Sequence, residues 1–289
     1  MSFYSVSQYS DNVFRTVRYT RPPVRGFSSG VKLADRTNDE KLEQSRIRAR
    51  RTIIELALCN KWDYFVTFTI SPEYFNRYEL FPIVNTLTQW FRDQRKQVGY
   101  EKISYMLVPE KHADGAWHFH GFMSGIPSDA LSPFVRGIHP LHLVESDYLN
   151  WRDLSAKFGW CSLGPVRDPV SCAFYCSEYF SKDAFRNVTE IGSHMYYCSR
   201  GLSRAQTVGW CYDSKPLFDN CIEHHTPFCS CGWMIDYDAL LVISNLDDIN
   251  AEALFPDQDN RVGEIEPDFE QMHLDGFPLS SFINPYSAG

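Results

Sequence analysis

Two histidines, His118 and His120, are separated by one aromatic residue in the stretch from Trp117 to Phe122. The stretch has the character of a β-strand, in which successive side chains lie on opposite faces. His118 and His120 are therefore expected on one face, while Trp117, Phe119 and Phe122 can pack into a core. Neutral imidazole is a common ligand of divalent metals, so two on neighbouring positions of one face form half of a metal site.

Glu110 is a candidate third ligand because of the hairpin that precedes the histidines. Residues 113–115 end in Gly115, and a three-residue hairpin loop needs a glycine at its third, left-handed position. With that loop, His112 faces Ala116. Glu110 then faces His118 and shares the face of the histidines. A different loop length would turn Glu110 to the other face.

These three residues would form a ligand set of two nitrogens and one oxygen with open positions. Such a set suits Mg²⁺ or Mn²⁺ acting on phosphate oxygens, with Zn²⁺ as an alternative. His112 is a reserve ligand. The competing interpretation is that His118 and His120 are ordinary strand residues, because a lone His-x-His pair often arises by chance.

A predicted helix supplies a candidate nucleophile. Asp168 and Pro169 are typical of a helix start, and the helix is expected to run to about residue 185. Tyr175, Tyr179 and Lys182 are spaced i, i+4, i+7 and lie on one stripe of that helix. Two hydroxyls and an ammonium suit a site at which a tyrosine attacks a phosphodiester. The alternative is an amphipathic helix that buries its aromatic residues.

The predicted elements follow an α+β order, which favours an antiparallel sheet with helices packed on it. We expect helices over residues 38–60, 79–98, 148–158 and 168–185, and strands over residues 62–70, 103–112, 116–124, 160–166 and 195–199.

Composition indicates a globular protein with an uneven distribution of charge. The net charge is −8 over 289 residues, but residues 236–289 carry −11, which leaves +3 for residues 1–235. Three parts are predicted: a basic N-terminal arm (1–37), a catalytic domain (38–205) and an extension with an acidic, partly disordered tail (206–289). Nine cysteines without a secretion signal indicate reduced thiols and a cytoplasmic protein, and no segment has the length of a membrane span.

Taken together, these motifs resemble those of the HUH endonucleases. Residues 65–69, Glu110 with residues 118–121, and residues 175–182 occur in the order of the three motifs of that superfamily. The surrounding sequence, over residues 61–202, is similar to the rolling-circle replication initiators of the filamentous-phage gene II type, which occur in phages and plasmids.

The resemblance implies an RRM-like or ferredoxin-like antiparallel sheet, with the histidines on a central strand and the tyrosine helix beside it. It also implies metal-dependent nicking of single-stranded DNA at an origin, a 5′-phosphotyrosine link, a free 3′-OH and later rejoining. Tyr175 and Tyr179 match the tyrosine pair of the family and Lys182 matches its cation. Glu178 departs from the family, which commonly has a basic residue there. A host polymerase and, since no phosphate-binding loop motif is present, a host helicase are the expected partners.

Two alternatives to an initiator stay open: an HUH transposase or relaxase, and a non-catalytic single-stranded-DNA-binding protein. A second group of metal-binding residue types does not match a common zinc spacing, so buried or incidental residues are favoured over a zinc site. The group consists of Cys221, His224, His225, Cys229 and Cys231.

Overall fold

The computed structural model describes residues 2–11, 13–19, 38–112, 114–173, 194–213, 222–225 and 229–235. The chain divides into two compact units, residues 48–203 and residues 1–47 with 204–289. The division falls inside helix α1 (Asn38–Cys59), whose bounds agree with the prediction. The predicted boundaries at residues 37 and 205 stay a prediction.

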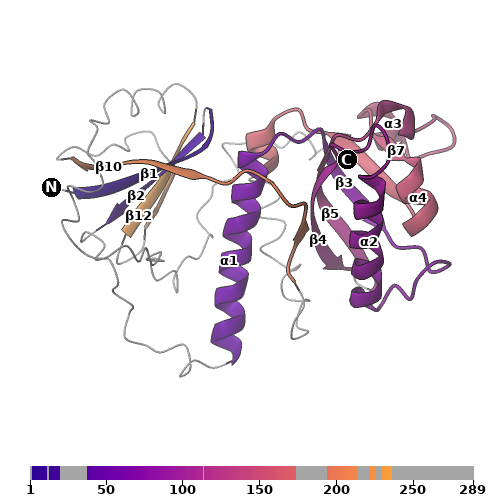
Figure 1. Ribbon diagram of the computed structural model, residues 1–289, viewed down its shortest axis with the longest axis horizontal. Coiled ribbons are helices and arrows are strands. Elements are labelled where there is room, and N and C mark those ends of the chain that lie inside the picture. Colours follow the sequence, from indigo (N-terminus) through magenta and orange to yellow (C-terminus); the bar gives the residue numbers. More distant parts are fainter. Residues whose placement is uncertain are drawn as a thin grey trace. The chain divides into compact units, whose positions relative to one another are not determined.

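The unit of residues 48–203 is built on a seven-stranded sheet in which every pairing is antiparallel (Figure 1). The strand order is β6-β7-β8-β3-β5-β4-β9. The strands are β3 (Tyr64–Thr69), β4 (Ser104–Lys111), β5 (Trp117–Ser124), β6 (Leu131–Pro133), β7 (Leu149–Trp151), β8 (Cys161–Pro165) and β9 (Tyr197–Cys198). The helices that follow α1 are α2 (Leu80–Gln94), α3 (Leu141–Glu145) and α4 (Arg152–Phe158), with a 3₁₀ turn at Ser128–Ala130. The predicted α+β class with an antiparallel sheet is confirmed.

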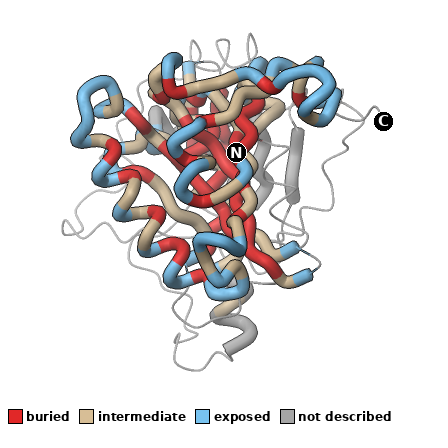
Figure 2. The backbone as a smooth tube through the Cα atoms, turned by 90° about the vertical axis from the view of Figure 1, so that its right-hand side faces the viewer, coloured by how far each residue is buried: buried red, intermediate tan, exposed pale blue. Residues whose placement is uncertain are grey.

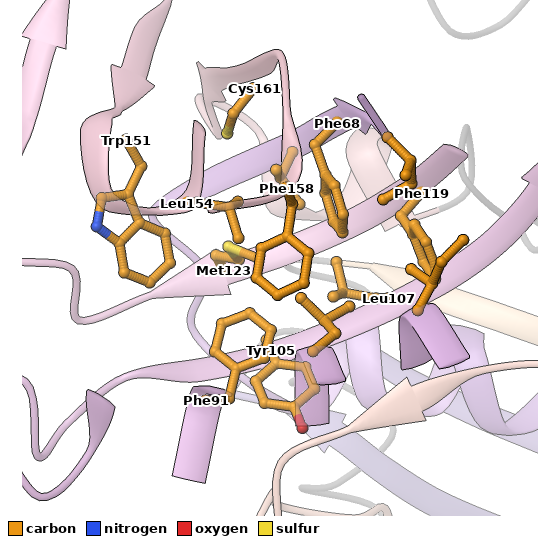
Figure 3. Close-up of a cluster of buried hydrophobic side chains, with 14 of the residues drawn as sticks. Phe68, Phe91, Tyr105, Leu107, Phe119, Met123, Trp151, Leu154, Phe158 and Cys161 are labelled. Carbon is orange, nitrogen blue, oxygen red and sulfur yellow. The ribbon is translucent and has the colours of Figure 1, made fainter. Parts of the chain in front are cut away.

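One face of this sheet packs against α2. The buried positions of α2 recur every three or four residues, which places them on one stripe of the helix. Phe68 and Phe119, on neighbouring strands, stack with ring centroids 4.8 Å apart, and Phe91 of α2 stacks on Tyr105 at 4.0 Å (Figure 3). Burial of each such side chain contributes about 1.5–3 kcal/mol. This core holds β5, the histidine strand, in place from behind.

The opposite face, which carries the histidines, is also covered near the end of β5. Phe122 packs against Trp62 and Phe65, with ring centroids 5.7 and 5.6 Å apart. The Trp62 Nε1–H donates to the carbonyl of Leu56 in α1. Phe122 is therefore buried, as expected, but on the face of His118, because residues 118 and 122 have the same strand parity. In Figure 2, buried positions gather in the interior and exposed ones lie mainly in the connecting loops.

Two predicted helix boundaries differ from the structure. The helix expected over residues 148–158 begins only at Arg152, because the three residues before it form β7 and pair with β6 and β8. The helix expected to reach residue 98 ends at Gln94. The helix start at residue 168 is confirmed: residues 169–173 are helical, and Asp168 Oδ1 accepts hydrogen bonds from the backbone N–H groups of Val170 and Ser171.

The second unit contains a five-stranded antiparallel sheet with the order β10-β1-β2-β12-β11. Strands β1 and β2 lie within the expected N-terminal arm and were not predicted from the sequence. Their partners, apart from each other, come from beyond residue 205. The strands are β1 (Ser2–Ser10), β2 (Val13–Tyr19), β10 (Gln206–Asp213), β11 (Ile222–His225) and β12 (Cys229–Ile235). None of the helices in the described part of the chain is both long enough and apolar enough to span a bilayer.

Candidate metal centre

The hairpin between β4 and β5 has the predicted register. His112 and Ala116 are joined by a hydrogen bond from the His112 N–H to the Ala116 carbonyl, at 2.9 Å. Gly115 has φ +83°, the left-handed conformation that the three-residue loop requires. Glu110 is therefore the direct partner of His118, and both lie on the same face. The step on which the metal hypothesis depended is confirmed.

Glu110, His118 and His120, called the triad below, bring their side-chain ends together. Glu110 Oε2 lies 3.0 Å from the Nε2 atom of each histidine, and the two Nε2 atoms are 3.2 Å apart. The histidine side chains are 8% and 9% exposed and that of Glu110 is 17% exposed. Within the described residues, this is the group of acidic, histidine or cysteine side chains that could hold a metal ion.

His112, the reserve ligand, lies beside the triad but is not part of that group. Its ring packs edge-on against His118, with centroids 3.9 Å apart. The contact restrains the ring of His118 from the side of the hairpin loop.

The electrostatics of the triad favour the protonation states that a metal ligand needs. Burial lowers the pKa of His120 and outweighs the hydrogen bond to Glu110, which acts in the opposite direction. Burial by itself would raise the pKa of the Glu110 carboxyl, but the hydrogen bonds to His118 and His120 prevail and lower it. Near neutral pH, Glu110 is charged and His120 is neutral, so neither must lose a proton to bind a cation.

These shifts predict that the metal-free protein loses stability on acidification. Both groups have folded-state pKa values below their unfolded ones, so the unfolded chain takes up protons first as the pH falls. The free energy of unfolding should fall below about pH 6.5 through His120 and further below about pH 4.5 through Glu110. Urea unfolding in the presence of a chelator, from pH 7.5 to 4, measures this. His120→Gln should flatten the upper part of the profile, and an equal slope in the variant would contradict the assignment.

Thr67 positions one of the two histidines. It pairs with His120 across β3 and β5, and its Oγ1 lies 2.9 Å from His120 Nδ1. An Nδ1–H donated to this hydroxyl leaves the lone pair of Nε2 free for a metal. The sequence analysis placed Thr67 in a motif but assigned it no role, because the pairing of β3 with β5 is not local.

Thr67→Val is expected to weaken Mn²⁺ binding about 10- to 100-fold while the fold is retained, because the hydrogen bond that orients His120 is lost. Isothermal titration with Mn²⁺ measures the change. Thr69→Val is the matched control, because Thr69 lies on the same strand face but pairs with His118, and the bond to His120 Nδ1 comes from Thr67. Equal affinities for the Thr67 variant and the wild type would exclude the positioning role.

Gly121, which follows the histidines, lets β4 approach β5 closely. A Cβ at this position would lie 1.9 Å from the carbonyl oxygen of Met106 and 2.9 Å from Leu107 Cα, both backbone atoms of β4. Since backbone cannot rotate away, a side chain here would push apart the two strands that carry the triad.

Gly121→Ala is therefore expected to lower the free energy of unfolding by about 3 kcal/mol. Gly137→Ala is the control: Gly137 has φ +86° but no atom within 4 Å of its added Cβ, so only backbone strain of about 1 kcal/mol is expected. Denaturant unfolding of both variants measures the difference. Similar losses would show that the approach of the strands is not limiting.

The predicted nucleophiles lie outside the described residues. Tyr175, Tyr179, Lys182 and Glu178 follow the helical residues 169–173, where the description of this helix ends. Their roles stay predictions.

An antiparallel α+β sheet with two histidines on an inner strand and a glutamate opposite one of them is the arrangement expected of an HUH endonuclease. Residues 63–184 match the model of a family of replication-associated proteins, described by its two members ORF2 and the gene II protein. The match spans the triad and confirms the resemblance to replication initiators of the gene II type. No curated protein and no solved structure matches the chain.

Proposed function

We propose that this chain initiates rolling-circle replication by nicking single-stranded DNA at a phage or plasmid origin. The observation that carries the proposal is the convergence of Glu110, His118 and His120 on one face of the sheet, inside the segment that matches the replication-associated family. A replication protein with such a group of ligands on a sheet has the parts for metal-assisted chemistry on phosphate.

Mg²⁺ or Mn²⁺ fits the triad better than Zn²⁺. With metal–ligand distances of about 2.1 Å, neighbouring ligands of an octahedral ion are about 3.0 Å apart, and those of a tetrahedral ion are about 3.4 Å apart. The three separations in the triad are 3.0, 3.0 and 3.2 Å. When bound there, the ion would withdraw negative charge from the scissile phosphate.

Tyr175 and Tyr179 are the proposed nucleophiles. The hydroxyl of one loses its proton, its oxygen bonds to phosphorus, and the bond from phosphorus to the 3′ oxygen breaks. The 5′ phosphate is then linked to the tyrosine, and the 3′-OH is released as the primer for a host polymerase. The second tyrosine can cleave the displaced strand in the same way, and attack by a 3′-OH on the phosphotyrosine link rejoins the ends. Lys182 would balance the charge that develops on phosphorus.

Unwinding ahead of the polymerase would come from a host helicase, with the bacterial cytoplasm as the expected location. The sequence has no Gly-x-x-x-x-Gly-Lys-Ser/Thr motif for a motor of its own.

Mapping the nick tests the proposal. The full chain is incubated with Mn²⁺ and single-stranded oligonucleotides that tile the replicon encoding it, and covalent adducts are separated on denaturing gels. One discrete nick at the origin, with a 5′-phosphotyrosine peptide identified by mass spectrometry, supports an initiator. Nicks confined to the ends of a mobile element or to a transfer origin would instead indicate a transposase or relaxase. Binding without any adduct would leave the non-catalytic DNA-binding alternative.

A further inference from the structure

Three metal-binding residue types share one face of the five-stranded sheet. Strands β11 and β12 pair so that His224 is the direct partner of Cys231. Directly paired residues of an antiparallel ladder lie on the same face, and so do residues two positions apart in one strand. Cys229 therefore joins His224 and Cys231 on that face.

This register repeats that of the triad in the other sheet. There, two ligands stand two positions apart on β5, and the third, on β4, is the direct partner of one of them. Its ligand atoms come within 3.0–3.2 Å of one another. In β11 and β12, Cys229 and Cys231 take the places of the two histidines, and His224 takes the place of the glutamate. A backbone arrangement that gathers three ligand atoms in one sheet thus occurs again in the second.

The chemistry of the second group differs from that of the first. Two thiolates and an imidazole are borderline-soft ligands that select Zn²⁺ over Mg²⁺ or Mn²⁺. The register also separates the two adjacent histidines, since His225 pairs with Ser230 and falls on the opposite face. Cys221 lies outside the described residues and is not part of the site.

We propose that His224, Cys229 and Cys231 form a zinc site that joins the edge strand β11 to β12. The two thiols lose their protons when the ion binds. Three protein ligands leave a fourth position of the tetrahedral ion to water or another group. The site is separate from the triad in sequence and in ligand type, and it does not depend on the proposed nicking activity.

Cobalt substitution tests the site, because thiolate-bound Co²⁺ has an intense charge-transfer absorption that oxygen and nitrogen ligands do not give. The metal-free full chain, kept reduced, is titrated with Co²⁺ and then with Zn²⁺. We expect a charge-transfer band that saturates with one equivalent of the sulfur site and disappears when Zn²⁺ is added. The triad holds no sulfur, so His118→Ala/His120→Ala should leave the band unchanged. A wild-type chain without the band would overturn the proposal.

Matched variants identify the ligands. Cys229→Ser or Cys231→Ser should reduce the band by about half or more, and His224→Ala should weaken Co²⁺ binding at least tenfold. His225→Ala and Cys211→Ser are the controls, because His225 is on the opposite face and Cys211 is on β10, at the other edge of the sheet. His224→Cys should strengthen the band by adding a third thiolate, which a purely structural role of His224 would not produce. A control variant that abolishes the band, or a His224→Cys variant without a gain, would exclude this ligand set.

Discussion

His118→Ala/His120→Ala is expected to lower Mn²⁺-dependent nicking about a thousandfold or more. The substitution removes both nitrogen ligands and leaves Glu110 as the remaining member of the triad. A metal contributes several kcal/mol of charge stabilisation to phosphoryl chemistry, and each 1.4 kcal/mol corresponds to a factor of about ten in rate. The covalent protein–DNA product, quantified over time on denaturing gels, measures the loss.

Two controls separate this effect from unfolding. His142→Ala replaces an exposed histidine of α3 and should nick at the wild-type rate. Isothermal titration should show that the double variant no longer binds Mn²⁺, and circular dichroism should show that its secondary structure is retained. Nicking at the wild-type rate by a folded double variant would end the metal assignment.

Tyr175→Phe/Tyr179→Phe is expected to abolish the covalent adduct altogether. Phenylalanine keeps the ring but removes the oxygen that would bond to phosphorus, so no 5′-phosphotyrosine can form. Binding of Mn²⁺ should be unchanged, which distinguishes this variant from the histidine variant. The two single substitutions, compared for cleavage of the first strand and for strand transfer, identify the tyrosine that attacks first.

The control for the tyrosines is Tyr74→Phe, which removes the hydroxyl of a tyrosine that is 50% exposed and lies outside the proposed nucleophile pair. It should form the adduct as the wild type does. An adduct that persists in the double tyrosine variant and maps to another residue would refute the nucleophile assignment but not the metal site.

The sequence alone was sufficient where the determining interactions are local. The loop of three residues ending in Gly115 sets the register of β4 and β5, because only a residue that readily adopts positive φ closes that turn. That register and the alternation of a strand are enough to place Glu110 beside His118, whatever the other strands do. The start of the helix at Asp168 was predictable for the same reason, since its side chain caps backbone groups two and three residues ahead.

Tertiary structure decided the features that depend on pairing between distant segments. Thr67 orients His120 only because β3 lies beside β5, although 53 residues separate the two positions along the chain. Residues 149–151 are a strand and not the start of a helix because β6 and β8 pair with them. Strands β1 and β2 find partners about 200 residues away, and the same sheet brings His224 onto the face of Cys229 and Cys231. Local alternation and turn chemistry specify a hairpin, but the hydrogen bonds between remote strands exist only once the whole sheet has formed.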